Sequence, residues 1–281
     1  MYYVQETDKP NCVFNLFNLI KLKDDKIILP AQNIGISLKK AEILAEKTKR
    51  ILDKTNCNKV ILSKKMKKYE NYKNYLYSKQ INIVDGRWLF EMLSYQAIEY
   101  ITKKQNMNKD ETTIAILIND ISNNILENVR KIVKEYKRVN IVTNHIGKFK
   151  NIEAQLFKQE GIIITVTNNK KKSLLKSKII LNVDFPTELI NKYSIYEEAI
   201  IINLKGNVKI NLKRFNGINI NDYEIDFIDL GDFDYDKNTL YDKKDIYEAQ
   251  IFQNQPFQYI QERIKNDKVE ITEMKGNKTI I

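Results

Sequence analysis

Several features that define common protein classes are scarce or missing in this sequence. Its 281 residues include only two cysteines, Cys12 and Cys57, which lie far apart and belong to no ligand motif. This excludes a disulfide scaffold and a cysteine-rich zinc site. No apolar stretch reaches the roughly eighteen residues of a transmembrane helix. The first residues contain neither a basic nor an extended apolar stretch, so we expect no secretory signal peptide and a cytoplasmic location.

Histidine and glycine are also scarce, and this limits the chemistry that the chain can carry. His145 is the only histidine, and no Walker loop, G-x-S-x-G or H-E-x-x-H motif occurs. These motifs provide a phosphate cradle, a nucleophile and a zinc site respectively. We therefore predict no metal and assign no catalytic residue from motifs.

The chain is basic, with 47 Lys and Arg against 36 Asp and Glu, a net charge of +11. Such a balance suits nucleic acid or an anionic ligand. Lys, Asn and Ile, which AT-rich codons encode, are all abundant here. Codon bias therefore accounts for much of the positive charge, and we favour a solvated lysine surface over a nucleic-acid interface. Residues 221–250 are instead acidic, and we interpret them as an exposed loop rather than a segment bound to a basic face of the protein.

Residues 1–105 alternate between short apolar strands and amphipathic helices. Ser37 is a candidate N-cap for the first long helix, whose apolar residues repeat at helical spacing. Two more helices are expected over residues 69–78 and 88–105. Strands are expected at residues 2–5, 14–23, 26–29, 59–63 and 81–84. We predict a smaller α/β domain over residues 1–105, which is a candidate substrate or partner domain.

The rest of the chain has a clearer rhythm of strand and helix, which indicates parallel βαβ units with right-handed crossovers. The expected strands are residues 113–118, 139–142, 162–166, 179–182, 199–204 and 218–220. We predict a Rossmann-like parallel-sheet domain over residues 112–243. Residues 244–281 are expected to form a helix, kinked at Pro256, and a tail strand at 269–274 that pack back on the N-terminal domain.

Ligands of open parallel sheets bind beyond the carboxyl ends of the strands, near the point where the strand order reverses. Polar residues follow several of the predicted strands. The candidate cofactor-binding residues at these strand ends are Asn119, Ser122, Asn123, Asn144, His145 and Asn182. In the first half, Asp85 and Arg87 follow a strand and open a helix, and are candidates for contacting a substrate.

Two strand ends carry a resemblance to a known family. Residues 139–145 end in Thr143-Asn144-His145, and residues 179–186 contain an apolar run, Asn182 and Pro186. Over about residues 112–204 the chain resembles the NAD(P)-binding Rossmann domain of the shikimate dehydrogenase and glutamyl-tRNA reductase group. That resemblance implies that Asn144 and His145 contact the ribose and 2′-phosphate of the cofactor. The family's catalytic motifs are absent.

The sequence departs from this family at the loop after the first strand, where glycine lets the backbone approach the pyrophosphate. No glycine occurs between Asp110 and His145. Asn123 and Asn124 can partly replace it, since Asn tolerates left-handed conformations. The first hypothesis is an oxidoreductase-like protein that binds NAD(P), with an unknown substrate. The alternative is a non-catalytic Rossmann-like module that binds another small ligand or a protein. A homodimer remains open.

Overall fold

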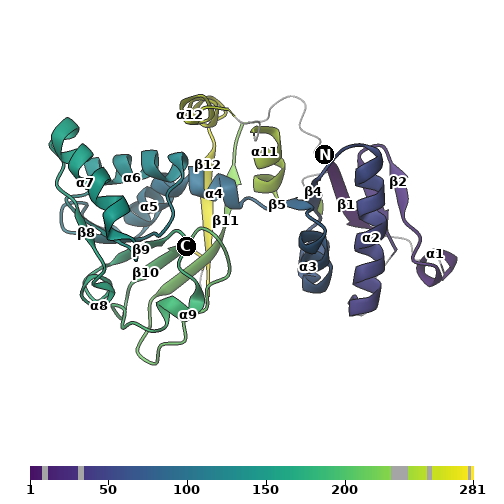
Figure 1. Cartoon of the computed structure of the whole chain (residues 1–281), viewed down its shortest axis with the longest axis horizontal. Helices are drawn as coiled ribbons and strands as arrows, with labels where there is room; N and C mark the ends of the chain where they lie inside the picture. Colours follow the sequence, from purple (N-terminus) through teal and green to yellow (C-terminus); the bar gives the residue numbers. More distant parts are fainter. Residues whose placement is uncertain (8–11, 31–34, 229–239, 252–254, 278–279) are drawn as a thin grey trace. The chain divides into compact units, whose positions relative to one another are not determined.

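A computed structural model describes residues 1–7, 12–30, 35–228, 240–251, 255–277 and 280–281. The chain divides into two compact units, each assembled from separate stretches of sequence. The first unit contains residues 1–86 and 229–254, and the second contains residues 87–228 and 255–281. Figure 1 shows both units, with most of their helices and strands labelled.

The first unit is built on a five-stranded sheet with the order β2-β3-β1-β4-β5. Only the edge strand β2 is antiparallel to its neighbour. The strands are β1 (Tyr2–Glu6), β2 (Lys21–Lys23), β3 (Lys26–Leu29), β4 (Lys59–Leu62) and β5 (Asn82–Val84). The strands expected at residues 14–23 and 26–29 correspond to β2 and β3, which pair as an antiparallel hairpin. Residues 14–16, expected in its first strand, instead belong to the short helix α1 (Cys12–Leu16).

Helices α2 (Leu38–Lys54) and α3 (Glu70–Ser78) pack on each other and on the first sheet. Ser37 caps α2 as predicted, since its Oγ accepts a hydrogen bond from the N–H of Lys40 at 3.4 Å. Inside, the hydroxyl of Tyr72 is paired with that of Thr48 at 2.8 Å. The core of this unit therefore lies between one face of the sheet and these two helices.

The second unit contains a seven-stranded sheet with the order β12-β11-β10-β9-β6-β7-β8. All neighbours are parallel except β12, which runs antiparallel to β11. The strands are β6 (Thr113–Leu117), β7 (Arg138–Val142), β8 (Thr165–Thr167), β9 (Ile179–Asn182), β10 (Ile200–Asn203), β11 (Ile218–Asp226) and β12 (Glu270–Gly276). The six parallel strands follow the doubly wound order 3-2-1-4-5-6, and the order reverses between β6 and β9.

Helices cover both faces of this sheet. In Figure 1, α6 (Asn123–Glu135) and α7 (Ile146–Glu160) lie on one side, and α8 (Lys170–Leu174) and α9 (Thr187–Ile190) lie on the other. The central strands β9 and β10 are buried at every residue, as strands covered on both faces must be. Gly161 ends α7 with a φ of 66°, the left-handed conformation that favours glycine at this position. The predicted fold class, a Rossmann-like parallel sheet preceded by a smaller α/β unit, is confirmed.

The division of the chain differs from the predicted boundaries at two places. The single helix expected over residues 88–105 is two helices, α4 (Arg87–Met92) and α5 (Ser94–Lys104), and both belong to the second unit. They do so because α4 and α5 contact α6, and α5 also contacts β12. The boundary therefore falls after Gly86 and not at residue 105.

The C-terminal segment is also shared between the units. Helix α11 (Lys243–Ile251) belongs to the first unit, whereas α12 (Phe257–Asn266) and β12 belong to the second. Pro256 is the N-cap of α12, where a missing N–H costs nothing. The tail joins the second unit because β12 pairs with β11.

Candidate functional site

The carboxyl ends of β6, β7 and β9 form the edge where the fold family places a ligand. The backbone N–H groups after β6 are the donors that would face a phosphate there. In this chain the carboxylate of Asp184, which follows β9, already accepts them. The N–H of Asn119 lies 2.9 Å from each carboxylate oxygen, and the N–H of Asp120 lies 2.7 Å from Oδ2. An anion of the protein itself therefore occupies this group of donors.

A second carboxylate lies at the start of α6. Ser122 caps this helix, because its Oγ accepts a hydrogen bond from the N–H of Ile125 at 3.2 Å. The same hydroxyl donates to Oε1 of Glu91 on α4. The amide of Asn128 holds α4 in place through the carbonyl oxygens of Glu91 and Met92, at 3.1 and 3.2 Å. The N-terminus of α6 is thus approached by a buried glutamate.

The remaining predicted residues near β7 are exposed. Asn123 is the first residue of α6, and Asn144 and His145 follow β7. The N–H of Asn144 donates to Oδ1 of Asn119 at 3.0 Å, and the N–H of His145 donates to Oγ1 of Thr143 at 3.0 Å. The structure therefore brings Asn119, Asn144 and His145 to one edge of the sheet. Whether they contact a cofactor stays a prediction.

Asn182 is part of a buried asparagine ladder, which we define as Asn182, Asn203, Asn219 and Asn221. The amide nitrogen of Asn182 donates to the side-chain oxygen of Asn203 at 2.9 Å, and its oxygen accepts from the N–H of Phe185 at 2.9 Å. The amide nitrogen of Asn203 donates to Asn219, to Asn221 and to the carbonyl oxygen of Ile220, at 2.8, 3.1 and 2.9 Å. Both the amide nitrogen and the amide oxygen of Asn182 therefore form hydrogen bonds within the fold.

The two candidate substrate residues fall on opposite sides of the unit boundary. Asp85 follows β5 in the first unit, and Arg87 begins α4 in the second. Both side chains are half-buried. One guanidinium nitrogen of Arg87 lies 3.5 Å from the carbonyl oxygen of Asn203. This contact brings Arg87 to the carboxyl end of β10, whereas Asp85 belongs to the other sheet.

A cavity of about 360 Å³ lies beside Asp184, between the loops that follow β9 and β10. Its charged lining consists of Asp184, Glu188 and Lys205. A dinucleotide carries two phosphates, so this balance of two carboxylates to one ammonium group is unfavourable for it. Across the described ranges, no group of three or more His, Cys, Asp or Glu side chains is arranged to hold a metal ion.

A cluster that the sequence analysis missed lies in the first unit. The segment from Leu240 to Ile251 crosses the carboxyl ends of β1, β4 and β5, where the carbonyl oxygen of Leu240 accepts from the N–H of Lys64 at 2.8 Å. On this segment Asp242 and Asp245 both form ion pairs with Lys67. The Nζ atom of Lys67 lies 2.5 Å from Oδ2 of Asp245. The interpretation of these acids as part of an exposed loop is therefore wrong. Residues 229–239 of that loop lie outside the described residues.

The burial of this cluster shifts its pKa values. Burial raises the pKa of Asp245 to about 7, and the nearby charge of Asp242 adds to the shift while Lys67 opposes it. Burial alone would lower the pKa of Lys67, but the charges of Asp245 and Asp242 outweigh burial and raise it. A lysine and an aspartate in a sequence rich in both give no signal by themselves. The pairing depends on residues that are distant in the chain.

We expect the stability of the protein to depend on the protonation of Asp245. The folded state holds this proton more tightly than the unfolded state, since the pKa rises from 3.8 to about 7 on folding. The contribution to stability is therefore complete below pH 4 and is lost as the pH rises to about 7. Melting temperatures at pH 5 and pH 8 should show a fall of several degrees in the wild type.

The matched variant for this prediction is Asp245→Asn, which keeps the side-chain volume and removes the titration. Its fall in melting temperature between pH 5 and pH 8 should be clearly smaller than that of the wild type. Equal falls for the two proteins would show that Asp245 does not titrate in this range.

Comparison with known proteins finds distant structural similarity and no family. No family model matches this chain, and no curated protein matches it. Among solved structures, it is similar to L-tryptophan dehydrogenase from Nostoc punctiforme, with 10% identity and a TM-score of 0.34. That match covers 67% of this chain and 53% of the dehydrogenase, so the chain matches about half of that protein.

Two further solved structures are comparably distant. Aspartate transcarbamoylase from Trypanosoma cruzi has 13% identity and a TM-score of 0.30, covering 73% of this chain and 71% of that one. A shikimate 5-dehydrogenase-like protein has 10% identity and a TM-score of 0.26, covering 71% and 76%. These similarities carry no information about activity. Within the described part of the chain, every helix is too short or too polar to span a membrane.

Proposed function

We propose that this chain is a non-catalytic Rossmann-like binding module rather than an NAD(P)-dependent oxidoreductase. The observation that carries the proposal is the carboxylate of Asp184 on the N–H groups of Asn119 and Asp120. These are the donors that a dinucleotide phosphate would need. A bound phosphate would have to displace an anion that forms three short contacts within the fold.

Two further observations support the proposal. Glu91 adds a second carboxylate at the N-terminus of α6 through Ser122. The loop after β6 also lacks glycine, so its side chains keep a pyrophosphate away from the backbone. One feature favours the oxidoreductase alternative. Asn144 and His145, which follow β7, are exposed, so their side chains are accessible to a cofactor.

The test is a titration of the whole chain with NADPH, NADH and ATP, followed by thermal unfolding. A ligand at a hundred times its dissociation constant stabilises a protein by about 2.7 kcal/mol, which raises the melting temperature of a chain this size by several degrees. We expect no increase with any of the three at millimolar concentration. An increase with NADPH or NADH would contradict the proposal and restore the oxidoreductase hypothesis.

The matched variant is Asp184→Ala, which frees the two N–H groups without adding a charge. If the carboxylate blocks the site, a nucleotide should stabilise this variant more than the wild type. The exposed Glu188→Ala, in helix α9 directly after the same loop, is the control for a general loss of negative charge. Equal responses of the two variants would mean that Asp184 does not block the donors specifically.

A further inference from the structure

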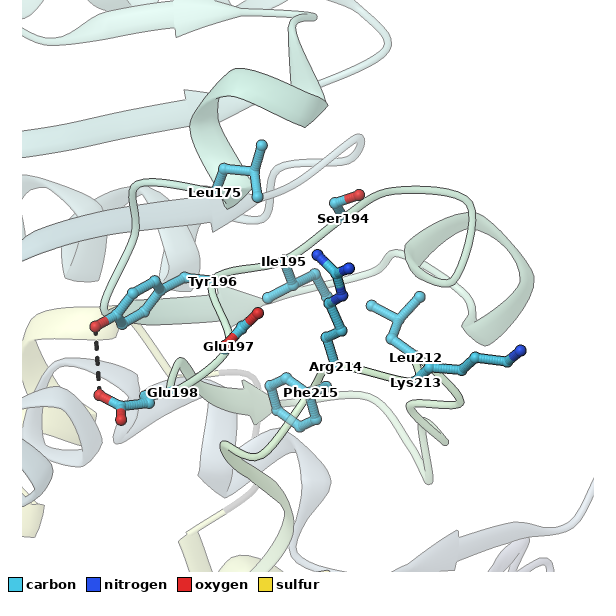
Figure 2. Close-up of a pocket in the computed structure, with 10 residues that line it drawn as sticks. All are labelled: Leu175, Ser194, Ile195, Tyr196, Glu197, Glu198, Leu212, Lys213, Arg214 and Phe215. Carbon is cyan, nitrogen blue, oxygen red and sulfur yellow. Dashed lines mark hydrogen bonds between the residues drawn. The ribbon is translucent and has the colours of Figure 1, made fainter.

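A second and larger cavity lies at the opposite edge of the second sheet. It has a volume of about 790 Å³ and is formed by Leu175, by residues 194–198 before β10, and by residues 212–215 before β11. It therefore lies at the amino ends of these strands, away from the crevice at their carboxyl ends. Its volume falls in the range of small-molecule sites. Figure 2 shows the ten side chains that line it.

The backbone around this cavity is held together by hydrogen bonds between its walls. The N–H of Asn216 donates to the carbonyl oxygen of Glu197 at 2.8 Å, and the N–H of Ile218 donates to that of Ala199 at 3.1 Å. Gly217 makes this close approach possible, because a Cβ there would lie 2.0 Å from the carbonyl oxygen of Ala199. The cavity walls are thus held in position by backbone hydrogen bonds of the fold.

The charged side chains of the cavity differ in direction. In Figure 2, the guanidinium of Arg214 and the carboxylate of Glu197 both point into the cavity, whereas the ammonium group of Lys213 points away from it. Glu198 is turned outward, and its Oε2 accepts a hydrogen bond from the hydroxyl of Tyr196 at 3.3 Å. Within the described residues, Arg214 and Glu197 form no ion pair with each other or with another side chain.

Apart from Ser194, the rest of the lining is aliphatic or aromatic. Ile195 is buried, and Leu212, Phe215 and Tyr196 are half-buried. The cavity therefore offers one cation, one anion and an apolar surface that includes an aromatic ring. A phosphate or another simple anion fits this set poorly, because Glu197 would repel it. A ligand that carries both charges and an apolar side chain pairs with Arg214 and Glu197 and covers the apolar surface.

We propose that this cavity binds a small zwitterion with a large apolar side chain, either a free amino acid or a short peptide. Its carboxylate pairs with the guanidinium of Arg214, which can donate two parallel hydrogen bonds. Its ammonium group pairs with Glu197, and its side chain packs on Phe215 and Leu212. This site is independent of the crevice at the other edge of the sheet, so a result with nucleotides does not decide it.

The test is isothermal titration calorimetry of the whole chain with L-phenylalanine and with L-leucyl-L-phenylalanine. Binding of only one of them identifies the amino acid or the peptide as the ligand, and binding of both shows that the cavity accepts either. For whichever binds, the N-acetylated form and the C-terminal amide should each bind at least tenfold more weakly, since each removes one charge. No heat from either ligand at millimolar concentration would overturn the proposal.

Paired variants assign the charges to residues. Arg214→Gln should weaken binding at least tenfold and remove the preference for the free carboxylate over the amide. Its neighbour Lys213→Gln, with the same change of charge, should alter affinity less than threefold. Glu197→Gln should likewise remove the preference for the free ammonium group, and Glu198→Gln should not. Equal effects within either pair would show that the ligand does not sit between Arg214 and Glu197.

Discussion

Asn203→Asp is expected to lower the free energy of unfolding by about 4 kcal/mol or more. The amide nitrogen of Asn203 donates to three oxygen atoms, one of which is the carbonyl oxygen of Ile220, which can only accept. A carboxylate at this fully buried position would face those oxygens with no proton to donate. Buried polar groups left unpaired cost about 1–3 kcal/mol each, and a buried charge costs more.

Urea unfolding of the wild type, Asn203→Asp and Asn203→Ala would measure this effect. The alanine variant should lie between the other two, because it removes the donor without adding a charge. Asn211→Asp is the matched control, since Asn211 is exposed and should change stability by less than about 0.5 kcal/mol. If Asn203→Asp were as stable as this control, the asparagine ladder would not be the network described.

Lys67→Met is expected to cost about 3–5 kcal/mol at pH 9, where Asp245 is ionised in the wild type, the usual penalty for removing one partner of a buried ion pair. Asp245 has no exposed side-chain surface, and its carboxylate depends on the Lys67 ammonium group 2.5 Å away. Methionine keeps the length of the side chain but leaves the two aspartates facing each other.

The exposed neighbour Lys68→Met is the control, and it should have an unfolding free energy close to that of the wild type. The double variant Lys67→Met, Asp245→Asn should recover a large part of the loss, because it no longer buries an unpaired charge. A double variant that is as unstable as Lys67→Met alone would place the cost in lost packing rather than in charge.

The strands of the second sheet could be predicted well from sequence because they are buried on both faces. Residues 114–118, 179–181 and 199–202 are continuous apolar runs, and they lie in β6, β9 and β10 within a residue or two. The strand expected at residues 162–166 is shifted to Thr165–Thr167. This strand lies at the edge of the sheet and only its central residue is buried, so an apolar run marks its position less clearly.

The break between α4 and α5 could not be predicted from periodicity. The apolar residues from Trp88 to Ile101 repeat at helical spacing across it, and no proline or glycine marks Leu93. Phe90 of α4 packs on Tyr223 of β11, with ring centroids 4.2 Å apart. This contact joins residues that are distant in the chain, so local sequence does not indicate it.

The candidate site shows the same limit. The sequence places Asn119, Asn144 and Asp184 at strand ends, and the parallel sheet brings those ends together. Nothing in the local pattern indicates that the carboxylate of Asp184 turns toward the loop after β6 instead of toward a ligand. Asparagine is frequent throughout the chain, so its role in the buried ladder was also hidden.

The way in which the chain alternates between units has a consequence for synthesis on the ribosome. Residues 1–86 emerge first, but α11 of the same unit ends only at Ile251. At ordinary translation speeds this delay is on the order of ten seconds or more. During that time Lys67 has neither of its aspartates, and the carboxyl ends of β1, β4 and β5 lack the segment that crosses them. The nascent chain therefore exposes an incomplete first unit while the second unit is still being made, which is the period when a chaperone would have most to protect.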